Sequence, residues 1–172
     1  MNFPYYRRLG KMKSKFIGIL MMLVLSSLTF GSYGHLGAEK DRDMTVQEMI
    51  KYAIEDEIFA KTEYEKIMKT FNIDRPFSNI KRAEETHIEL LQPLIEKYNV
   101  SYDKLDEKSL VIPKTLKETF EIGVQAEIDN IAMYEKFLKD EKLPADVREV
   151  FTHLRDGSKN HLRAFERQLR KY

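Results

Sequence analysis

The polar residues with the clearest chemical meaning are five glutamates and histidines that could bind a metal ion. In the stretch RAEETHIELL, Glu84 and His87 are three residues apart, which places them on one face of a helix. Glu57, Glu127 and His161 each stand near the middle of another apolar, helix-like pattern. The chain has no cysteine, so a metal site would have to use carboxylates and imidazoles, which suit iron, manganese or zinc. These five residues are the predicted metal ligands.

For any one of these residues there is an ordinary alternative. A lone Glu-x-x-His pair in a charged helical protein usually faces solvent, a lone glutamate is usually exposed, and a lone histidine is usually hydrogen-bonded to a neighbour. The joint pattern favours a metal, because buried carboxylates without cations would each cost several kcal/mol against a net stability of about 5–15 kcal/mol. A metal also explains why all four predicted helices contribute a polar residue at matching depth.

Two tyrosines repeat at the same distance from the predicted ligands. Tyr64 follows Glu57 by seven residues in EIFAKTEY, and Tyr134 follows Glu127 by seven residues in EIDNIAMY. Seven residues make about two helical turns, so each tyrosine shares a face with its glutamate about 10 Å further along. Core packing and a role as hydrogen-bond donors around the metal both remain open for the pair.

These residues lie on four predicted helices, which span residues 44–73, 76–98, 115–140 and 144–170. The first two and the last two are joined by short turns, which makes each pair antiparallel, and a long segment connects the pairs. The sequence contains no convincing strand pattern. The predicted fold class is therefore all-α, with the layout of a ferritin-like four-helix bundle that has one long crossover between helices 2 and 3.

Local signals set the ends of these helices. Thr45 with Glu48, and Thr115 with Glu118, have the spacing of a capping box, which predicts two helix starts. Pro93 falls inside the second helical pattern, so the sequence predicts a kink or an early end there.

The first 38 residues are predicted to be a signal peptide rather than part of the bundle. Five basic residues without any acid precede an apolar run of fifteen residues and a stretch of small residues, with Ala38 as the predicted last residue before cleavage. This order predicts an exported protein, either extracellular, periplasmic or in the cell envelope, with a bundle domain over 39–172. An uncleaved N-terminal anchor is the alternative, and it is the only membrane contact that the sequence suggests.

Removing this segment leaves 24 basic and 28 acidic residues. A mildly acidic domain is a poor partner for nucleic acid, so none is expected. Metal ions are the predicted partners, and a homodimer is left open.

The pattern of these motifs resembles the ferritin-like superfamily, in particular its rubrerythrin-type and bacterioferritin-type diiron bundles. EIFAKTEY is similar to the first-helix motif of that superfamily, EETH to the second-helix Glu-x-x-His, and GVQAEIDNIAMYEKF to the third-helix glutamate. The closing string LRDGSKNHLRAF resembles more narrowly a family of exported ferritin-like domains of unknown function. The resemblance covers about residues 44–170.

The sequence departs from the superfamily at one position. The fourth helix usually carries a second Glu-x-x-His, but Ser158 stands three residues before His161 in place of the glutamate that helps to bridge two metals. The resemblance therefore implies one metal held tightly by Glu57, Glu84 and His87, and a weaker second metal near Glu127 and His161. Water or the Ser158 hydroxyl would complete the set of ligands around this second metal.

The resemblance implies a metal-binding protein, with iron as the expected metal and manganese or zinc as alternatives. Oxidation of Fe(II), or reaction with dioxygen or peroxide, is the activity that it suggests. A metal-free envelope bundle that binds a partner is the competing function. Iron storage ranks last, because nothing in the sequence encodes a multi-subunit shell.

Overall fold

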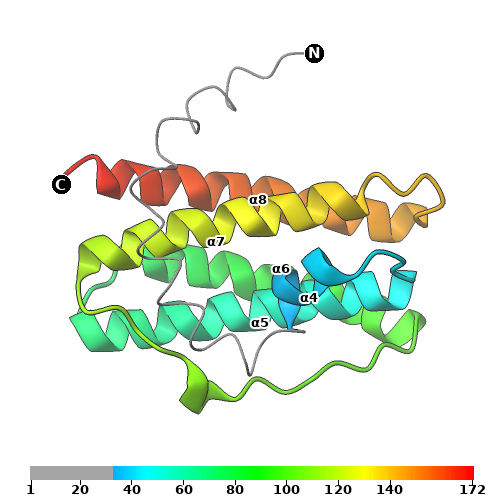
Figure 1. Cartoon of the computed structure of the whole chain (residues 1–172), viewed down its shortest axis with the longest axis horizontal. Helices are drawn as coiled ribbons and strands as arrows, with labels where there is room; N and C mark the ends of the chain where they lie inside the picture. The colour runs from blue at the N-terminus through cyan, green and yellow to red at the C-terminus, as the bar shows by residue number, and fades with distance from the viewer. Residues whose placement is uncertain (1–32) are drawn as a thin grey trace. The chain divides into compact units, whose positions relative to one another are not determined.

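The computed structural model describes residues 33–172, which form a bundle of four long helices (Figure 1). The elements in chain order are α4 (Gly34–Lys40), α5 (Val46–Phe71), α6 (Phe77–Lys97), a 3-10 turn η1 (Glu107–Ser109), α7 (Leu116–Phe137) and α8 (Ala145–Leu169). Helix α5 packs on α6 and α7 packs on α8, and the two pairs meet where α6 contacts α8 and α5 contacts α7. The all-α prediction and the long crossover are thereby confirmed.

Both predicted capping boxes are present. The Thr45 hydroxyl accepts from the Glu48 backbone N–H at 3.2 Å, and the Glu48 carboxylate accepts from the Thr45 N–H at 2.7 Å. Thr115 and Glu118 make the same reciprocal pair at the start of α7. These bonds satisfy backbone donors that the first helical turn leaves without partners, which is why α5 and α7 begin where the sequence predicts.

Pro93 does not end α6, since the helix continues to Lys97. The predicted early end of this helix is therefore wrong. A proline removes the hydrogen bond to the carbonyl four residues earlier, which here belongs to Glu89. Both Pro93 and Glu89 are exposed, so water can take the place of the missing donor.

The crossover from Tyr98 to Thr115 follows the length of the bundle before α7 begins (Figure 1). Near its start, the Asp103 backbone N–H donates to Glu55 Oε1 at 3.0 Å, and Lys51 forms an ion pair with the Asp103 carboxylate at 2.9 Å. These contacts tie the long connection to α5.

Helix α4 is an element that the sequence did not predict. The Gly34 backbone N–H donates to Glu55 Oε2 at 3.1 Å, and Lys136 donates to the Ala38 carbonyl at 2.6 Å. A segment of seven residues is too short to be helical by itself, so tertiary packing supplies its stability. Ala38 is fully buried in this helix, so the predicted boundary between residues 38 and 39 falls inside α4. The predicted signal segment is otherwise outside the described residues, and its cleavage stays a prediction.

The apolar core consists of two clusters with a polar layer between them. One cluster contains Phe77, Phe120 and Phe165, and the other contains Phe137 and Phe151. The predicted ligands fall between these clusters along each long helix. Within residues 33–172, no helix is both long and apolar enough to cross a membrane.

Candidate metal centre

The structure brings all five predicted ligands together at the middle of the bundle. Glu57 comes from α5, Glu84 and His87 from α6, Glu127 from α7 and His161 from α8, and each is at most 6 % exposed. They form two groups of three residues that could hold a metal ion, which we call the first and second triads. The first triad is Glu57, Glu84 and His87, and the second is Glu84, Glu127 and His161.

In the first triad, one imidazole nitrogen faces two carboxylates. His87 Nδ1 lies 2.9 Å from Glu57 Oε2 and 2.9 Å from Glu84 Oε2. A single nitrogen cannot donate one proton fully to both oxygens, but it can share a cation with both. The nitrogen and the two carboxylate oxygens therefore lie close enough together to bind one metal ion.

The second triad uses the other oxygen of Glu84. His161 Nδ1 lies 3.1 Å from Glu84 Oε1 and 3.5 Å from Glu127 Oε1. Although these distances are short, the nitrogen is not aligned for a hydrogen bond and is left without a hydrogen-bond partner. The sequence assigned Glu84 to the first metal alone, whereas the structure places it between both histidines.

Each of the two tyrosines donates a hydrogen bond to a glutamate on another helix. Tyr64 of α5 donates to Glu127 Oε1 at 2.8 Å, and Tyr134 of α7 donates to Glu57 Oε1 at 2.6 Å. Each tyrosine thus orients the glutamate of the opposite helix rather than the one that precedes it in its own helix. Hydrogen bonds of this kind fix the direction in which a ligand carboxylate points.

Ser158 belongs to a chain of buried hydrogen bonds. Its hydroxyl lies 2.6 Å from Asn130 Oδ1 and 3.1 Å from the Leu154 carbonyl. Asn130 in turn donates to Asp56 Oδ2 at 2.5 Å, and Asp56 Oδ1 lies 2.6 Å from His35 Nδ1. The hydroxyl proton is therefore engaged with Asn130 or Leu154, and the chain extends from α8 to α4.

Gly157 allows the His87 ring to approach α8. A Cβ atom on Gly157 would lie 2.5 Å from His87 Nε2 and 2.6 Å from Cε1, which is closer than real Cβ atoms come to their neighbours. Since Nε2 faces this glycine, Nδ1 faces the carboxylates. The glycine in DGSKNH is thus required by the position of a ligand on another helix.

Burial and neighbouring charges shift the pKa values of this centre in opposite directions. Burial and the neighbouring Glu84 charge raise the pKa of Glu57 to about 8. Burial also opposes ionisation of Glu84, but His161 and His87 together lower its pKa below the usual value. Burial lowers the pKa of both histidines, but the facing carboxylates outweigh it and raise that of His87 to about 10 and that of His161 to about 11. Without a metal, the imidazoles thus hold protons that balance the carboxylates.

Several residues around the centre were not found from the sequence. Asp56 is next to Glu57, and Asn130 is three residues after Glu127. In the sequence, both resemble ordinary polar residues of a charged helix. Glu63 is buried beside Tyr64, and His35 lies in the segment assigned to the signal peptide. Spacing alone offers one signal, since Asp56 and Glu63 are seven residues apart and share a face of α5.

The donor set fits a metal ion. Three carboxylates and two imidazoles surround one buried region, and the orphaned His161 Nδ1 faces two carboxylate oxygens without a hydrogen bond. That nitrogen is ion-paired with Glu84 at 3.1 Å but makes no hydrogen bond, and a metal ion bound by His161, Glu84 and Glu127 would use all three of these donor groups. Oxygen and nitrogen donors of this kind suit iron, manganese and zinc.

Four long helices in two antiparallel pairs, one long crossover and a buried carboxylate–histidine centre define a helical bundle consistent with a ferritin-like fold. The chain belongs to the family described as "Uncharacterized protein domain (DUF2202)", whose model matches residues 46–172. The buried centre is made entirely of residues within that range.

The chain is similar to an archaeal protein of the same helical architecture. It is 31 % identical over 115 residues to "Uncharacterized protein MJ0754" of Methanocaldococcus jannaschii, and the match spans 56 % of this chain and 60 % of that protein. It also matches the crystal structure of hypothetical protein MJ0754 from Methanococcus jannaschii DSM 2661 with a TM-score of 0.65 and 25 % identity. That match covers 77 % of this chain and 85 % of the archaeal chain.

Proposed function

We propose that this protein binds one or two metal ions in the carboxylate–histidine centre, and that iron is the metal. The observation that carries the proposal is His161 Nδ1, which is buried without a hydrogen bond while two carboxylate oxygens face it. Glu84 offers one oxygen to each histidine, so a carboxylate shared by two ions is available even though Ser158 replaces the customary glutamate. The resemblance to rubrerythrin-type and bacterioferritin-type bundles supports iron over manganese or zinc.

The residues of the centre would have two roles, which are binding of the ions and positioning of the ligands. The first triad would hold one ion and the second triad another, with Glu84 common to both. Tyr64 and Tyr134 would hold Glu127 and Glu57 in position. Bound iron would supply redox chemistry toward dioxygen or peroxide, and a ferroxidase activity is the proposed reaction. The protein would act outside the cytoplasm, which rests on the order of residues in the first 38 positions.

The metal content of untagged protein tests this proposal. Purified protein should contain iron by elemental analysis, and the metal-free form should bind Fe(II) without oxygen in a calorimetric titration. Glu84→Gln should remove binding at both triads, because both share this carboxylate. Glu85→Gln is the matched control, since Glu85 is the next residue and pairs with Lys81 at the surface. Equal binding by the two variants would contradict the proposal, and absorption changes after Fe(II) is added in air would report the oxidation.

A metal-free bundle that binds a partner is the second candidate. It is favoured by the direct contacts of His87 Nδ1 with Glu57 and Glu84, which balance charge without an ion. Under this alternative the protein would contain no metal after purification and would fail to bind Fe(II), Mn(II) or Zn(II). Elemental analysis therefore separates the two functions directly.

A further inference from the structure

A small cavity extends from the metal centre toward α4. Its inner wall contains three of the predicted ligands, Glu57, Glu84 and Glu127. Its volume of about 30 Å³ has room for about one or two water molecules. The cavity is therefore a place where an ion near the centre could exchange ligands with water.

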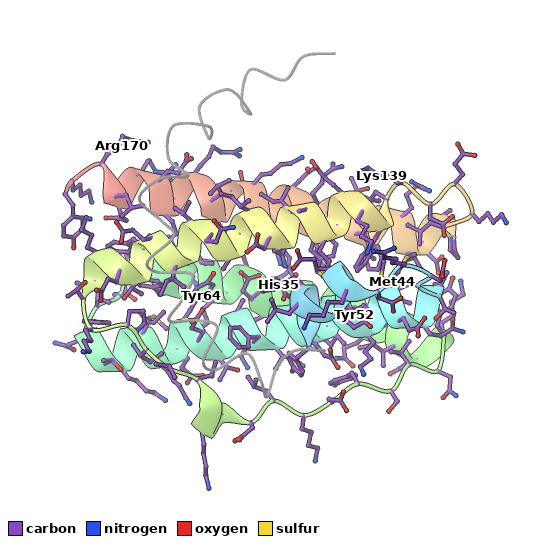
Figure 2. The ribbon with its side chains drawn as sticks, viewed as in Figure 1. His35, Met44, Tyr52, Tyr64, Lys139 and Arg170 are labelled. Atoms are coloured by element: carbon purple, nitrogen blue, oxygen red, sulfur yellow. The ribbon has the colours of Figure 1, made fainter. Side chains whose placement is uncertain are left out.

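The outer wall of the same cavity is made of half-buried residues. Ala60 and Ala126 leave space there because their side chains are small, and the ring of His35 lies beside them. Figure 2 shows His35 projecting from α4 where that helix lies against α5. The His35 side chain is 23 % exposed, so at this end one lining residue of the cavity lies at the surface of the described bundle.

Glu63 lines the cavity and is the one carboxylate there that lacks a partner among the described residues. It is 7 % exposed and makes no hydrogen bond or ion pair with any residue from 33 to 172. Asp56, on the same wall, is instead held by the His35 ring at 2.6 Å and by the Asn130 amide at 2.5 Å. Glu63 thus differs from Asp56 in having an unused carboxylate that faces the cavity.

A largely buried carboxylate without a protein partner is unfavourable unless it is protonated, hydrated by water in the cavity or bound to a cation. Burial and the charges of Asp56 and Glu127 outweigh that of His35 and raise the pKa of Glu63 to about 7. Glu63 is six residues after Glu57 on α5, which places it about 9 Å further along the helix. It belongs to neither triad, so it cannot be one more ligand of the centre as built.

We propose that Glu63 is an accessory site for a divalent cation, which it binds briefly in the cavity before the cation reaches Glu127 and Glu84. This inference rests on the proposed metal-binding function and assigns its entry route. The carboxylate replaces part of the hydration shell that the cation sheds as it enters. When it is ionised, its charge attracts cations into the cavity, where the positive charge of His35 is balanced by Asp56.

The rate of metal binding tests this role. Co(II) serves as the probe because its visible absorption reports binding at the centre, and it is mixed rapidly with the untagged metal-free protein. Glu63→Gln should slow association about tenfold while leaving the number of tightly bound ions unchanged. Glu63→Asp should keep most of the rate, because it keeps the charge. Glu65→Gln is the matched control, since it removes one charge two residues away from a side chain that pairs with Lys69 outside the cavity.

Each other outcome overturns the inference. If the association rate is unchanged in Glu63→Gln, Glu63 is not an accessory site. If Glu65→Gln slows association equally, the effect comes from the overall charge of the helix and not from a site at Glu63. A lower number of tightly bound ions in Glu63→Gln would make Glu63 a ligand of the centre. If the unmodified protein binds no Co(II) at all, the proposed function itself fails and the entry route fails with it.

Discussion

Glu84 is the residue on which the centre depends most. Its two oxygens face different histidines, at 2.9 Å for His87 and 3.1 Å for His161. The superfamily resemblance implied that the loss of a glutamate at Ser158 leaves the second metal short of a carboxylate. The structure offers a partial replacement, because Glu84 serves both triads from α6.

The contact of Gly157 with His87 leads to a first prediction. Gly157→Ala should weaken metal binding at the first triad about tenfold or more, because the added methyl group would push the imidazole away from Glu57 and Glu84. Alanine is otherwise the better helix former, so the helix itself should not suffer. A calorimetric titration with Mn(II), with circular dichroism to verify the fold, would measure the loss.

Gly123→Ala provides the control for this prediction. A Cβ at Gly123 would meet the Phe165 ring at 3.0 Å, so it introduces a milder crowding away from the ligands. That variant should lose stability but keep its metal affinity. An unchanged affinity in Gly157→Ala would mean that His87 does not need its present position.

The position of Ser158 leads to a second prediction, which concerns unequal occupancy. We expect the first triad to bind its ion more tightly than the second, and Ser158→Glu to raise the affinity of the second about tenfold by adding a carboxylate beside Glu127 and Glu84. The new side chain must displace the bond to Asn130. Ser158→Ala breaks that bond without adding charge and should give no gain. Anaerobic titration with Fe(II) would show the difference, and two equal tight sites in the unmodified protein would contradict it.

Helix α4 is the element that the sequence did not predict, and polar contacts hold it in place together with the buried Ala38. His35 Nδ1 lies 2.6 Å from Asp56 Oδ1, and the His35 backbone N–H donates to the same oxygen at 2.9 Å. Asp56 is 7 % exposed, so it would be an unfavourable buried charge without this partner. The short helix and the buried acid therefore stabilise each other.

This pair leads to a third prediction, about stability and pH. The Asp56 charge outweighs burial and raises the pKa of His35 from 6.5 to about 9. A raised histidine pKa stabilises the fold fully below the unfolded value and stops doing so as the pH rises through about 9. His35→Ala should thus lower the free energy of unfolding by about 2–3 kcal/mol at pH 6, and the deficit should shrink toward pH 10.

Urea unfolding of the metal-free full chain at the two pH values would measure this deficit, since a chain cleaved after Ala38 would lack His35. His153→Ala, at an exposed position of α8 beside the His87 ring, is the control and should show the same small loss at both pH values. A deficit in His35→Ala that does not depend on pH would show that the imidazole acts by packing and not by charge.

The four long helices could be predicted because several local signals agreed. The capping boxes at Thr45 and Thr115, the apolar period and the short joints all indicated the same elements. The five ligands followed from their matching depth. The cross-pairing of the tyrosines, the shared use of Glu84 and the contact at Gly157 depend on how the helices are rotated against each other, which the periodicity does not determine. The early end of the helix at Pro93 was wrong and α4 was not predicted for similar reasons, since solvent decides the first and tertiary contacts decide the second.

The molecule as a whole must accommodate a layer of charge between two apolar clusters. Eleven polar or charged residues are buried in residues 33–172, including the five ligands. Pairing among carboxylates and imidazoles makes this layer tolerable without a metal, although His161 Nδ1 is ion-paired with Glu84 without a hydrogen bond. A domain that is stable by only about 5–15 kcal/mol should respond measurably when that layer gains a cation.

The last prediction is that metal binding stabilises the entire bundle. An ion at the first triad requires α5 and α6 to be packed together, and an ion at the second triad requires α6, α7 and α8, so the two sites together depend on all four long helices. At a free concentration of about 100 times the dissociation constant, the ion adds about 2.7 kcal/mol. For a domain of this size that should raise the midpoint of thermal unfolding by about 5–10 °C. Calorimetry with Mn(II), and again after removal by a chelator, would measure the shift. Glu84→Gln should abolish the shift and Glu85→Gln should retain it, whereas an equal shift in both would place the stabilising ion outside the centre.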